Sequence, residues 1–331
     1  MDRPDQPNRD PLPRLVAVVV THNRLAQLRI TLPRLLESPA AELAGVVVVD
    51  NASPDGTAAW LARQNDARLR VVRSEANLGG AGGFERGMQA AVALFDPDWI
   101  VVMDDDARPE PGALARFHAA DRSGAEAWAA AVYHPDGRIC DINRPSINPF
   151  WHREVLIRML GGAGRDGFHL GPSDYAATEP RDIDGTSFVG LFVSRAAIDR
   201  VGFPDGRLFL YGDDVLYTLG LTRAGGRIRF DPALRFEHDF STMTETDRRF
   251  RPLWKSYYHY RNLLMVYRMA AGAFFWPALA VVLPKWLLKV RHHSGERRAY
   301  LRLLAKAVGH GLSRNTDVAH DQVVAWAEGP S

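Results

Sequence analysis

The first hundred residues alternate between short uninterrupted apolar runs and longer segments in which apolar positions recur at helical spacing. Leu15–Thr21 reads LVAVVVT and Gly45–Asp50 reads GVVVVD, so apolar, β-branched residues occupy successive positions. This pattern is typical of strands that are buried on both faces of a parallel sheet. The runs at 69–72 and 99–103 predict a third and a fourth strand.

Three segments between these runs are predicted to be helical, at 25–37, 57–64 and 83–95. Alternating strands and helices predict an α/β fold with a doubly wound sheet. In such sheets the ligand binds beyond the carboxyl ends of the strands. The polar residues that follow the four strands, and that we expect at this edge, are Thr21, His22, Asn23, Arg24, Asp50, Asn51, Asn77 and the triplet Asp104, Asp105 and Asp106.

The acidic triplet at 104–106, where the fourth apolar run ends, is the most informative feature of the chain. Crowded carboxylates repel one another unless a cation neutralises them, and hard oxygen donors favour Mg²⁺ or Mn²⁺. These ions usually share their coordination shell with substrate phosphates. The triplet therefore predicts a metal–diphosphate site, with a solvated acidic loop as the alternative.

Patterning is less regular in the middle of the chain. A hairpin is predicted over 128–133 and 138–141, around a Pro-Asp-Gly turn, and the glycine-rich stretch 161–174 is expected to be mobile. The later predicted elements are a strand over 188–194, helices over 195–201 and 213–224, and short strands over 227–230 and 234–237.

Three residues of this second half are candidates for chemistry. Asp213 and Asp214 open a predicted helix, where a carboxylate can cap the helix or act as the general base that removes a proton from an acceptor hydroxyl. His238 follows a predicted strand and could offer a neutral ring nitrogen to a metal ion. A single histidine is more often structural, but this one accompanies a carboxylate cluster.

Two further motifs precede predicted helices. Asp50 begins the segment DNASPDGT at a strand end, where acidic residues of nucleotide sites accept hydrogen bonds from a base or a ribose; turn and capping roles for this segment are the alternative. Residues 77–84 read NLGGAGGF and predict a glycine-rich loop whose amides, Gly80 included, can approach a ligand closely. The motif lacks the features of a P-loop or a dinucleotide fingerprint, which argues against ATPases and dehydrogenases.

The last third of the chain contains an uncharged segment at 269–284, which holds Pro277 and Pro284. It is shorter than the ~20 apolar residues of a spanning helix, and we expect the prolines to interrupt it. An interfacial hairpin with a basic rim on an anionic membrane is favoured, and a buried helical pair or an oligomer contact is the alternative. The aromatic and basic residues concerned are Phe274, Phe275, Trp276, Lys285, Lys289, Arg291, His292 and His293.

Composition changes this picture little. The 331 residues are 46% hydrophobic and 24% charged, as in an ordinary globular protein, and a net charge of +2 gives no case for nucleic-acid binding. The single cysteine, Cys140, excludes an internal disulfide and a multi-thiolate zinc site, so a cytosolic setting is expected. Residues 1–14 are polar and proline-rich, and we expect a flexible tail without a secretory signal.

Four pieces in this order and spacing carry a family resemblance: THNR at 21–24, DNAS at 50–53, NLGGAGGF at 77–84 and MDDD at 103–106. Together they resemble the family 2 inverting glycosyltransferases of the GT-A fold. The last two pieces are most similar to galactofuranosyltransferases and their rhamnosyltransferase relatives. The similarity covers about residues 15–238, and WKSYYHYRN at 254–262 also resembles a segment of that group.

The resemblance implies a role for each candidate residue. Asp104 and Asp106 would hold Mn²⁺ or Mg²⁺ against the donor diphosphate, with His238 as the third protein ligand. Asp214, with Asp213 beside it, would deprotonate the acceptor. The residues implied in binding the nucleotide-sugar donor are Thr21, Asn23, Arg24, Asp50, Asn77, Gly80 and Asp105.

The implied reaction is a metal-dependent inverting transfer of galactofuranose from UDP-galactofuranose to a lipid-linked or cell-surface glycan, at the cytoplasmic face of the membrane. Transfer from dTDP-rhamnose and a non-catalytic nucleotide-sugar- or glycan-binding protein on the same scaffold are the alternatives. One departure concerns the helix after Asp214, which in such enzymes tends to carry an acidic residue and an arginine four positions later. Leu216 and Gly220 occupy those positions here, so an ion pair on one helix face is lost.

The expected domain organisation follows from the resemblance and from the change of character near the C-terminus. A GT-A catalytic domain would cover 15–245, with a nucleotide-sugar-binding half at 15–106 and an acceptor half at 107–245. A helical region, expected at the membrane, would cover 246–331. The oligomeric state stays open.

Overall fold

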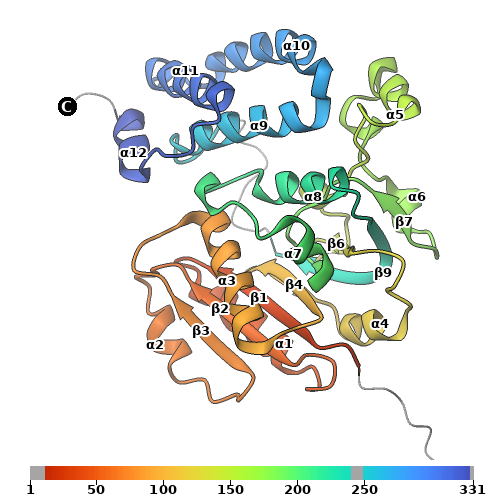
Figure 1. The fold of residues 1–331 in the computed structure, drawn as a ribbon. Coiled ribbons are helices and arrows are strands. Elements are labelled where there is room, and N and C mark those ends of the chain that lie inside the picture. Colours follow the sequence, from red (N-terminus) through yellow and green to blue (C-terminus); the bar gives the residue numbers. More distant parts are fainter. Residues whose placement is uncertain (1–11, 240–248, 329–331) are drawn as a thin grey trace, which may run out of the picture.

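The structure is a computed structural model that describes residues 12–239 and 249–328 (Figure 1). Most of the predicted N-terminal tail and the predicted domain boundary at residue 245 lie outside the described residues. The described chain forms a mixed sheet covered by helices, with a group of four helices at its C-terminal end (Figure 1).

The N-terminal part is the predicted alternation of strands and helices. Its four strands are parallel and lie in the order β3-β2-β1-β4. Thr21 pairs with Asp50 and Val20 pairs with Asp104, so the polar residues at the strand ends meet at one edge. The elements are β1 (Leu15–Thr21), α1 (Leu25–Leu36), β2 (Gly45–Asp50), α2 (Thr57–Leu61), β3 (Leu69–Arg73), α3 (Gly79–Phe95) and β4 (Trp99–Asp104).

The sheet continues beyond β4 with strands of mixed direction, in the order β8-β6-β9-β5, and β7 pairs with β9. The fold class predicted from sequence is confirmed. The further elements are β5 (Ala107–Pro109), α4 (Ala113–Ala119), β6 (Ala127–Tyr133), α5 (Arg153–Arg158), α6 (Pro172–Tyr175), β7 (Arg181–Ile183), β8 (Leu191–Ser194), α7 (Arg195–Val201), α8 (Asp213–Arg223) and β9 (Ile228–His238).

Several predicted boundaries in this second part are wrong. The two strands expected near 227–237 are one strand, β9. The residues between them form a bulge opposite Ala130 and Ala131, so the strand continues through the interruption in the apolar pattern. The expected hairpin reduces to one bridge between Tyr133 and Ile139, since β6 pairs with β8 and β9 instead. The strand expected over 188–194 begins only at Leu191. The stretch 161–174 contains short helical turns rather than irregular chain.

The glycine-rich segment is not a loop, because α3 begins at Gly79, four residues before the predicted start. Its glycines let the helix lie directly on β1. A Cβ on Gly83 would come within 2.4 Å of Val20, and one on Gly87 within 2.4 Å of Val18. The prediction failed because glycine was interpreted as conformational freedom, whereas the close packing of helix on sheet is what requires it.

The sheet is buried on both faces, as the apolar runs predicted. Val16 and Val18 face one core while Ala17 and Val19 face the other, and all four are fully buried. Two layers of helices therefore cover the strands, and the strand ends that carry the polar residues are held rigidly.

The C-terminal helices build a third core of their own, rich in aromatic residues. The chain reverses at Gly272, which has a φ of +52°, and Trp286 then packs on Tyr260 with ring centroids 4.8 Å apart (Figure 1). The helices are α9 (Lys255–Ala271), α10 (Phe275–Leu288), α11 (Arg297–Ser313) and α12 (His320–Glu328).

The prediction that proline interrupts the uncharged segment is wrong, since both prolines lie inside α10. Pro277 is in the first turn, where a missing N–H breaks no helical hydrogen bond. By length and composition alone, Lys255–His292 is long and apolar enough to cross a membrane, which is weak evidence because core helices pass the same test. Only 22% of its most apolar window is buried, so much of this apolar surface is exposed.

Candidate active site

The end of β4 and the end of β9 meet at the acidic triplet. Asp104, Asp106 and His238 each place one ligand atom within 4.8 Å of the other two. His238 reaches the triplet because β9 runs antiparallel to β5, with His238 paired to Ala107. The structure therefore brings together the three residues that the sequence nominated for a metal, from positions more than a hundred residues apart.

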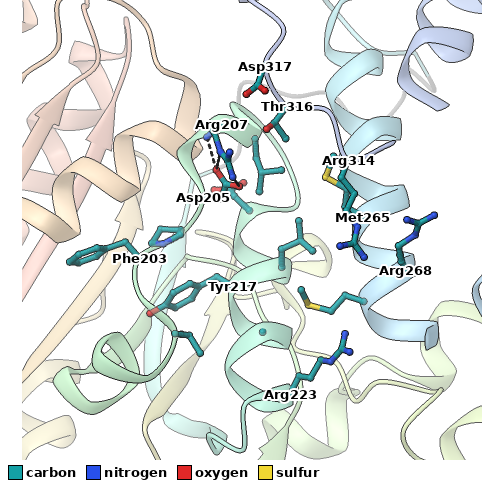
Figure 2. Close-up of a pocket in the computed structure, with 17 residues that line it drawn as sticks. Phe203, Asp205, Arg207, Tyr217, Arg223, Met265, Arg268, Arg314, Thr316 and Asp317 are labelled. Atoms are coloured by element: carbon teal, nitrogen blue, oxygen red, sulfur yellow. Dashed lines mark hydrogen bonds and ion pairs between the residues drawn. The ribbon is translucent and has the colours of Figure 1, made fainter. Parts of the chain in front are cut away.

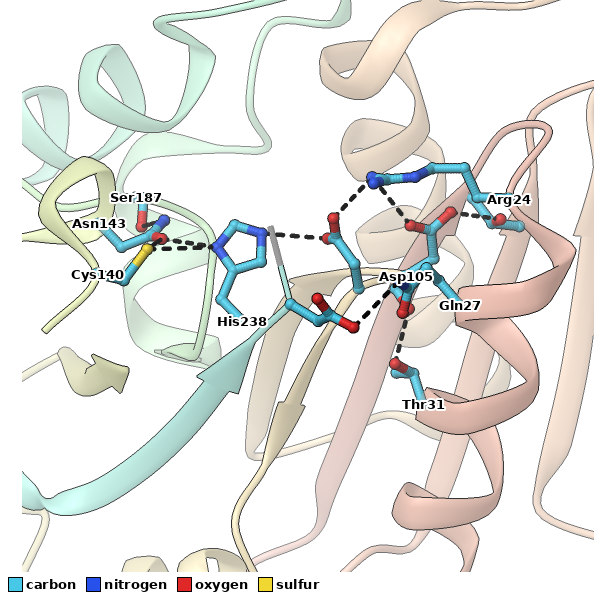
Figure 3. Close-up of polar contacts among 11 residues, drawn as sticks. Arg24, Gln27, Thr31, Asp105, Cys140, Asn143, Ser187 and His238 are labelled. Carbon is cyan, nitrogen blue, oxygen red and sulfur yellow. Dashed lines mark hydrogen bonds and ion pairs between the residues drawn. The ribbon is translucent and has the colours of Figure 1, made fainter. Parts of the chain in front are cut away.

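A chain of hydrogen bonds orients the ring of His238 (Figure 3). Its Nε2 lies 3.2 Å from Asp106 Oδ1, and its Nδ1 lies 2.8 Å from Asn143 Oδ1, which accepts the ring proton. The thiol of Cys140 donates to the same amide oxygen, and Asn143 Nδ2 donates to Ser187 Oγ. Such outer contacts fix which ring nitrogen faces a ligand. Sequence reasoning missed these three residues, because they lie in irregular segments without periodicity.

The middle carboxylate of the triplet is held by β1 and the loop that follows it. Thr21 Oγ1 donates to Asp105 Oδ2 over 2.6 Å, and Thr31 Oγ1 donates to the Asp105 carbonyl (Figure 3). Arg24 Nη1 lies 2.7 Å from Asp106 Oδ2 and 3.5 Å from Asp105 Oδ1. Arg24 thus bridges two of the three carboxylates, while Asp105 is not one of the three clustered ligand residues.

Burial and neighbouring charges shift the pKa values of the three aspartates in different directions. Burial, together with the charge of Asp106, raises the pKa of Asp104 to about 6, and burial raises the pKa of Asp105 to about 7. Burial alone would also raise the pKa of Asp106, but the hydrogen bond and charge of His238 and the charge of Arg24 lower it. Conversely, burial would lower the pKa of His238, and the Asp106 carboxylate raises it to about 10.

A second acidic pair lies at the N-terminus of α8. Burial and the charge of Asp214 raise the pKa of Asp213 well above its usual value. Burial raises the pKa of Asp214 to about 6, although its Oδ1 accepts the backbone N–H of Val215 over 2.7 Å. The charge of Asp214 also contributes to the raised pKa of Asp104. The pair is therefore close enough to the triplet for the two clusters to interact.

The segment that resembles WKxYYxxRN fixes the chain just before this acidic pair. Asn262 Nδ2 donates to the carbonyls of Leu208, Leu210 and Tyr211, and Arg261 Nη2 donates to the carbonyl of Leu208. Both side chains are fully buried in α9. The C-terminal helices thus hold the loop that leads into α8.

Asp50 and Asn23 lie at the far end of the strand edge. Asp50 is fully buried, and its Oδ1 accepts the N–H of Ser53 over 2.9 Å. Its Oδ2 has no hydrogen-bond partner among the described residues, and the nearest cation, Arg73 Nε, is 3.9 Å away. Asn23 has a φ of +55° and donates its backbone N–H to Ser53 Oγ.

Asn77 and Gly80 flank the start of α3. The side-chain oxygen of Asn77 accepts hydrogen bonds from Asn51 Nδ2 and from the N–H of Gly79. These bonds connect the loop after β2 to the loop after β3. Gly80 has open space where a Cβ would be. Neither residue is among the three clustered ligand residues.

The known proteins to which this sequence is similar are glycosyltransferases. Residues 16–163 match the model of glycosyl transferase family 2. The chain is 32% identical over 212 residues to galactofuranosyltransferase GlfT1 of Mycolicibacterium smegmatis, covering 63% of this chain and 65% of that protein. It is 30% identical over 179 residues to undecaprenyl-phosphate mannosyltransferase of Micrococcus luteus, covering 52% of this chain and 70% of that protein. It is 28% identical over 222 residues to N-acetylglucosaminyl-diphospho-decaprenol L-rhamnosyltransferase of Mycobacterium tuberculosis, covering 61% of this chain and 68% of that protein.

The chain is also similar in fold to two solved structures. The structure matches TarS of S. aureus in complex with UDP-GlcNAc with a TM-score of 0.55 at 14% identity, over 92% of this chain and 83% of that chain. It matches GalNAc-T7 with UDP, GalNAc and Mn²⁺ with a TM-score of 0.54 at 16% identity, over 78% of this chain and 48% of that chain. The chain spans just under two thirds of the length of the GlfT1 galactofuranosyltransferases that it matches and 40% of the length of the GlfT2 proteins. With the family model, the relatives and the fold in agreement, the chain belongs to glycosyltransferase family 2.

Proposed function

We propose that this glycosyltransferase is a metal-dependent inverting enzyme that moves galactofuranose from UDP-galactofuranose to a lipid-linked or cell-surface glycan. The observation that carries the proposal is the pairing of two acidic clusters. One, with Asp104, Asp106 and His238, has the donor set of a metal site. The other, Asp213 and Asp214, lies within electrostatic reach of it and has no ion pair with a cationic side chain among the residues that the structure describes.

The residues of the first cluster fit a divalent cation. Two carboxylates and an imidazole are ligands that Mn²⁺ accepts readily, and Mg²⁺ accepts the carboxylates. The ring of His238 is oriented by Asn143, so that Nε2 faces Asp106. Burial and the charge of Asp106 raise the pKa of Asp104, and a cation bound beside it would offset both effects. When bound, the ion would neutralise the diphosphate of the donor and stabilise its departure.

In the proposed reaction Asp214 removes the proton of an acceptor hydroxyl. The freed oxygen forms a bond to the anomeric carbon, the bond from that carbon to the diphosphate breaks, and the nucleoside diphosphate departs with the electron pair. Direct displacement inverts the anomeric configuration and needs no covalent enzyme intermediate. A pKa of about 6 leaves Asp214 ionised near neutral pH and more basic than an ordinary carboxylate.

Donor recognition is assigned to the opposite end of the strand edge. The unpartnered Oδ2 of Asp50 would accept a hydrogen bond from the nucleoside. Because the hydroxyl of Thr21 is engaged with Asp105, we assign these two residues to holding Arg24 beside the diphosphate. Asn23, Asn77 and Gly80 would shape the loops around the nucleotide, with the close approach of the backbone permitted at Gly80.

The choice of sugar rests on the relatives. The galactofuranosyltransferase match has the higher identity, so galactofuranose is proposed as the transferred sugar. The rhamnosyltransferase match keeps dTDP-rhamnose as the second candidate. Two of the relatives carry polyprenyl phosphates in their names, which supports a lipid-linked acceptor for this chain.

A lipid-linked acceptor would require the enzyme at a membrane, and we propose that it binds the cytoplasmic face. The C-terminal helices expose large apolar side chains, among them Phe274 at 55% and Trp276 at 63%. Lys285, Lys289 and Arg291 are exposed on the same helical segment, whereas His293 is buried against Tyr300 and drops out of the expected basic rim.

The donor assay tests the proposal directly. Purified protein is incubated with UDP-galactofuranose, dTDP-rhamnose and UDP-glucose, each with and without Mn²⁺, and with membrane lipid extract as the acceptor source. We expect nucleoside diphosphate release that requires Mn²⁺ or Mg²⁺ and is fastest with UDP-galactofuranose. Faster release from dTDP-rhamnose would replace the sugar assignment, and full activity in excess chelator would exclude the metal role.

A further inference from the structure

The loop at 206–212, which leads into the acidic pair, has a strained backbone. Six non-glycine residues of the described chain have a positive φ, and two of them, Phe209 at +66° and Tyr211 at +68°, lie in this loop. The N–H of Leu210 donates to the carbonyl of Leu208 over 2.8 Å, which closes a γ-turn around Phe209. Bulky side chains disfavour such a backbone, and it persists only where surrounding contacts enforce it.

The fully buried amide of Asn262 supplies such contacts. Its two N–H groups face the carbonyls of Leu208, Leu210 and Tyr211, at 3.0, 2.9 and 2.8 Å. Arg261 Nε donates to Asn262 Oδ1 over 2.8 Å, which fixes the amide with its nitrogen toward the turn. One side chain of α9 therefore holds three carbonyls of the strained turn.

The space beside the turn is not filled by packing. A cavity of about 510 Å³ opens between α8 and α9, and both Leu208 and Asp213 line it (Figure 2). Figure 2 shows Arg207, on the segment before the turn, with its guanidinium bonded to Asp205 rather than to the acidic pair. The open space leaves this chain free to move if the hydrogen bonds from α9 are lost.

The turn also contacts the part of the site that is proposed to bind the donor. The N–H of Ala81, in the first turn of α3, donates to the carbonyl of Phe209 over 3.2 Å. A Cβ on Gly79 would come within 1.9 Å of the same carbonyl oxygen, so the two segments are in direct contact. The carbonyl of Gly79 in turn accepts a hydrogen bond from Asn51 Nδ2 over 2.8 Å. The turn thus connects the loop after β2 to the start of α8.

The acidic pair follows the turn directly. Gly212, with a φ of +77°, comes after Tyr211, and Asp213 and Asp214 then open α8. A backbone rotation at 211 or 212 would redirect the chain at the point where these carboxylates begin.

We propose that Asn262 is a positioning residue for the acidic pair: its amide keeps the turn at 208–211 in its strained shape, and that shape determines where Asp213 and Asp214 lie. The inference rests on the proposed function and adds to that site a residue that acts only through the backbone of the turn.

Asn262→Leu tests the assignment, because leucine is of similar size, adds no charge and removes the two donors. We expect kcat to fall about tenfold or more, while donor affinity changes less than about twofold. The pH–rate profile is the sharper readout. A displaced Asp214 would lose part of its burial, so the apparent pKa of about 6 should fall toward about 4. A variant that is merely less folded would lose rate and keep the apparent pKa, which would overturn the proposal.

Tyr260→Phe is the matched control on the same helix. It removes the buried hydrogen bond between the hydroxyls of Tyr260 and Tyr300, which joins α9 to α11 rather than to the turn. Its kcat and pH–rate profile should stay at wild-type values. If the control and Asn262→Leu lose the same activity, the effect is general destabilisation and the assignment is wrong.

Glycine at position 211 tests the strain itself. Glycine adopts a positive φ without steric cost, whereas alanine removes the ring and keeps that cost. In the Asn262→Leu background, Tyr211→Gly should therefore give a kcat at least about threefold higher than Tyr211→Ala, and equal values would contradict the strain. If Asn262→Leu does not fold, the same two variants are compared in the wild-type background. There Tyr211→Gly should have the higher melting temperature, and an equal or lower one would overturn the proposal.

Hydrogen exchange separates this proposal from the proposed function, since it needs no turnover. Asn262→Leu should speed the exchange of backbone amides in 208–216, and Tyr260→Phe should not. If no donor is turned over and this exchange difference is present, the catalytic assignment is wrong and the positioning assignment stands. If the wild type turns over donor and Asn262→Leu keeps its kcat and pH–rate profile, the positioning assignment is wrong and the catalytic assignment stands.

Discussion

The acidic triplet at the end of β4 and the acidic pair at the start of α8 differ in the groups that balance their negative charge. In the triplet at the end of β4, Asp106 contacts both Arg24 and His238, and Asp105 contacts Arg24. At the start of α8 the acidic pair has backbone N–H groups for partners and no cationic side chain among the described residues that the structure pairs with it.

This difference separates two kinds of chemistry that depend on carboxylates. Groups held ionised by fixed cations are suited to electrostatic work, and here a divalent ion would complete the balance around Asp104. A carboxylate whose pKa is raised by burial, as for Asp214, is suited to accepting a proton near neutral pH. The proposed metal site and the proposed general base thus differ in environment rather than in residue type.

The largest effect is expected from breaking the first cluster. Asp104→Ala and Asp106→Ala should each abolish turnover and metal-dependent donor binding, because each removes a proposed ligand. The two variants should differ in stability. Asp104→Ala relieves repulsion, so its melting temperature should hold or rise, whereas Asp106→Ala removes the carboxylate that pairs with His238 and the nearer of the two that pair with Arg24, and should cost on the order of 1–3 kcal/mol.

Thermal melts and donor titrations with and without Mn²⁺ check both parts. Wild-type turnover in either variant would contradict the metal assignment. Equal stability losses in the two variants would contradict the electrostatic division of the triplet.

Asp214→Asn tests the second cluster, because it keeps the shape of the side chain and removes the proposed base. Donor affinity should be retained and kcat should fall by at least ~10²-fold, as is typical when a general base is lost. Steady-state kinetics together with donor binding separate the two quantities. A kcat near the wild-type value would move the role to Asp213, and an unfolded variant would favour helix capping as the main task of Asp214.

The pKa of about 6 for Asp214 predicts how kcat and stability change with pH, which tests whether the acidic pair at the start of α8 supplies the base. Below that value kcat should fall about tenfold per pH unit as the base becomes protonated, and above it kcat should be level. Stability should run the other way. Because the folded pKa is raised, the contribution of Asp214 is fully present below its unfolded pKa of about 4 and is lost as pH rises through about 6.

Asp214→Asn removes this titration, so the variant should be more stable than the wild type at pH 8 and no more stable at pH 4. Melting temperatures across this pH range provide the check. A pH–rate profile that is flat from pH 5 to 8 in the wild type would show that Asp214 does not set the rate.

The two parts of the sheet differ in how far the sequence could predict them. Strands β1, β2 and β4 are buried on both faces, so their apolar runs marked the boundaries closely, and the polar residues at their ends followed. The sequence also nominated the cluster ligands Asp104, Asp106 and His238. It could not show that they meet, because the approach of His238 depends on the antiparallel pairing of β9 with β5.

The failures share one physical cause, which is that tertiary contacts decided the local structure. In the glycine-rich segment, Gly83 was needed for the packing of α3 on the sheet and not for a loop. The orienting residues Cys140 and Asn143 gave no periodic signal, because only tertiary packing brings their short segments to His238.

The smallest expected effect concerns the surface of α10 that is proposed to bind the membrane. Each exposed basic residue near an anionic surface contributes on the order of 1 kcal/mol, so Lys285→Ala or Arg291→Ala should each weaken binding to phosphatidylglycerol vesicles about fivefold at low salt. Trp276→Glu should weaken it through the apolar contact, since that side chain is 63% exposed and its replacement leaves the aromatic core in place. Co-sedimentation at 50 and 300 mM salt measures both contributions, with Arg29→Ala as the charge control. If the wild type ignores anionic vesicles at low salt, the proposed membrane binding through α10 is wrong.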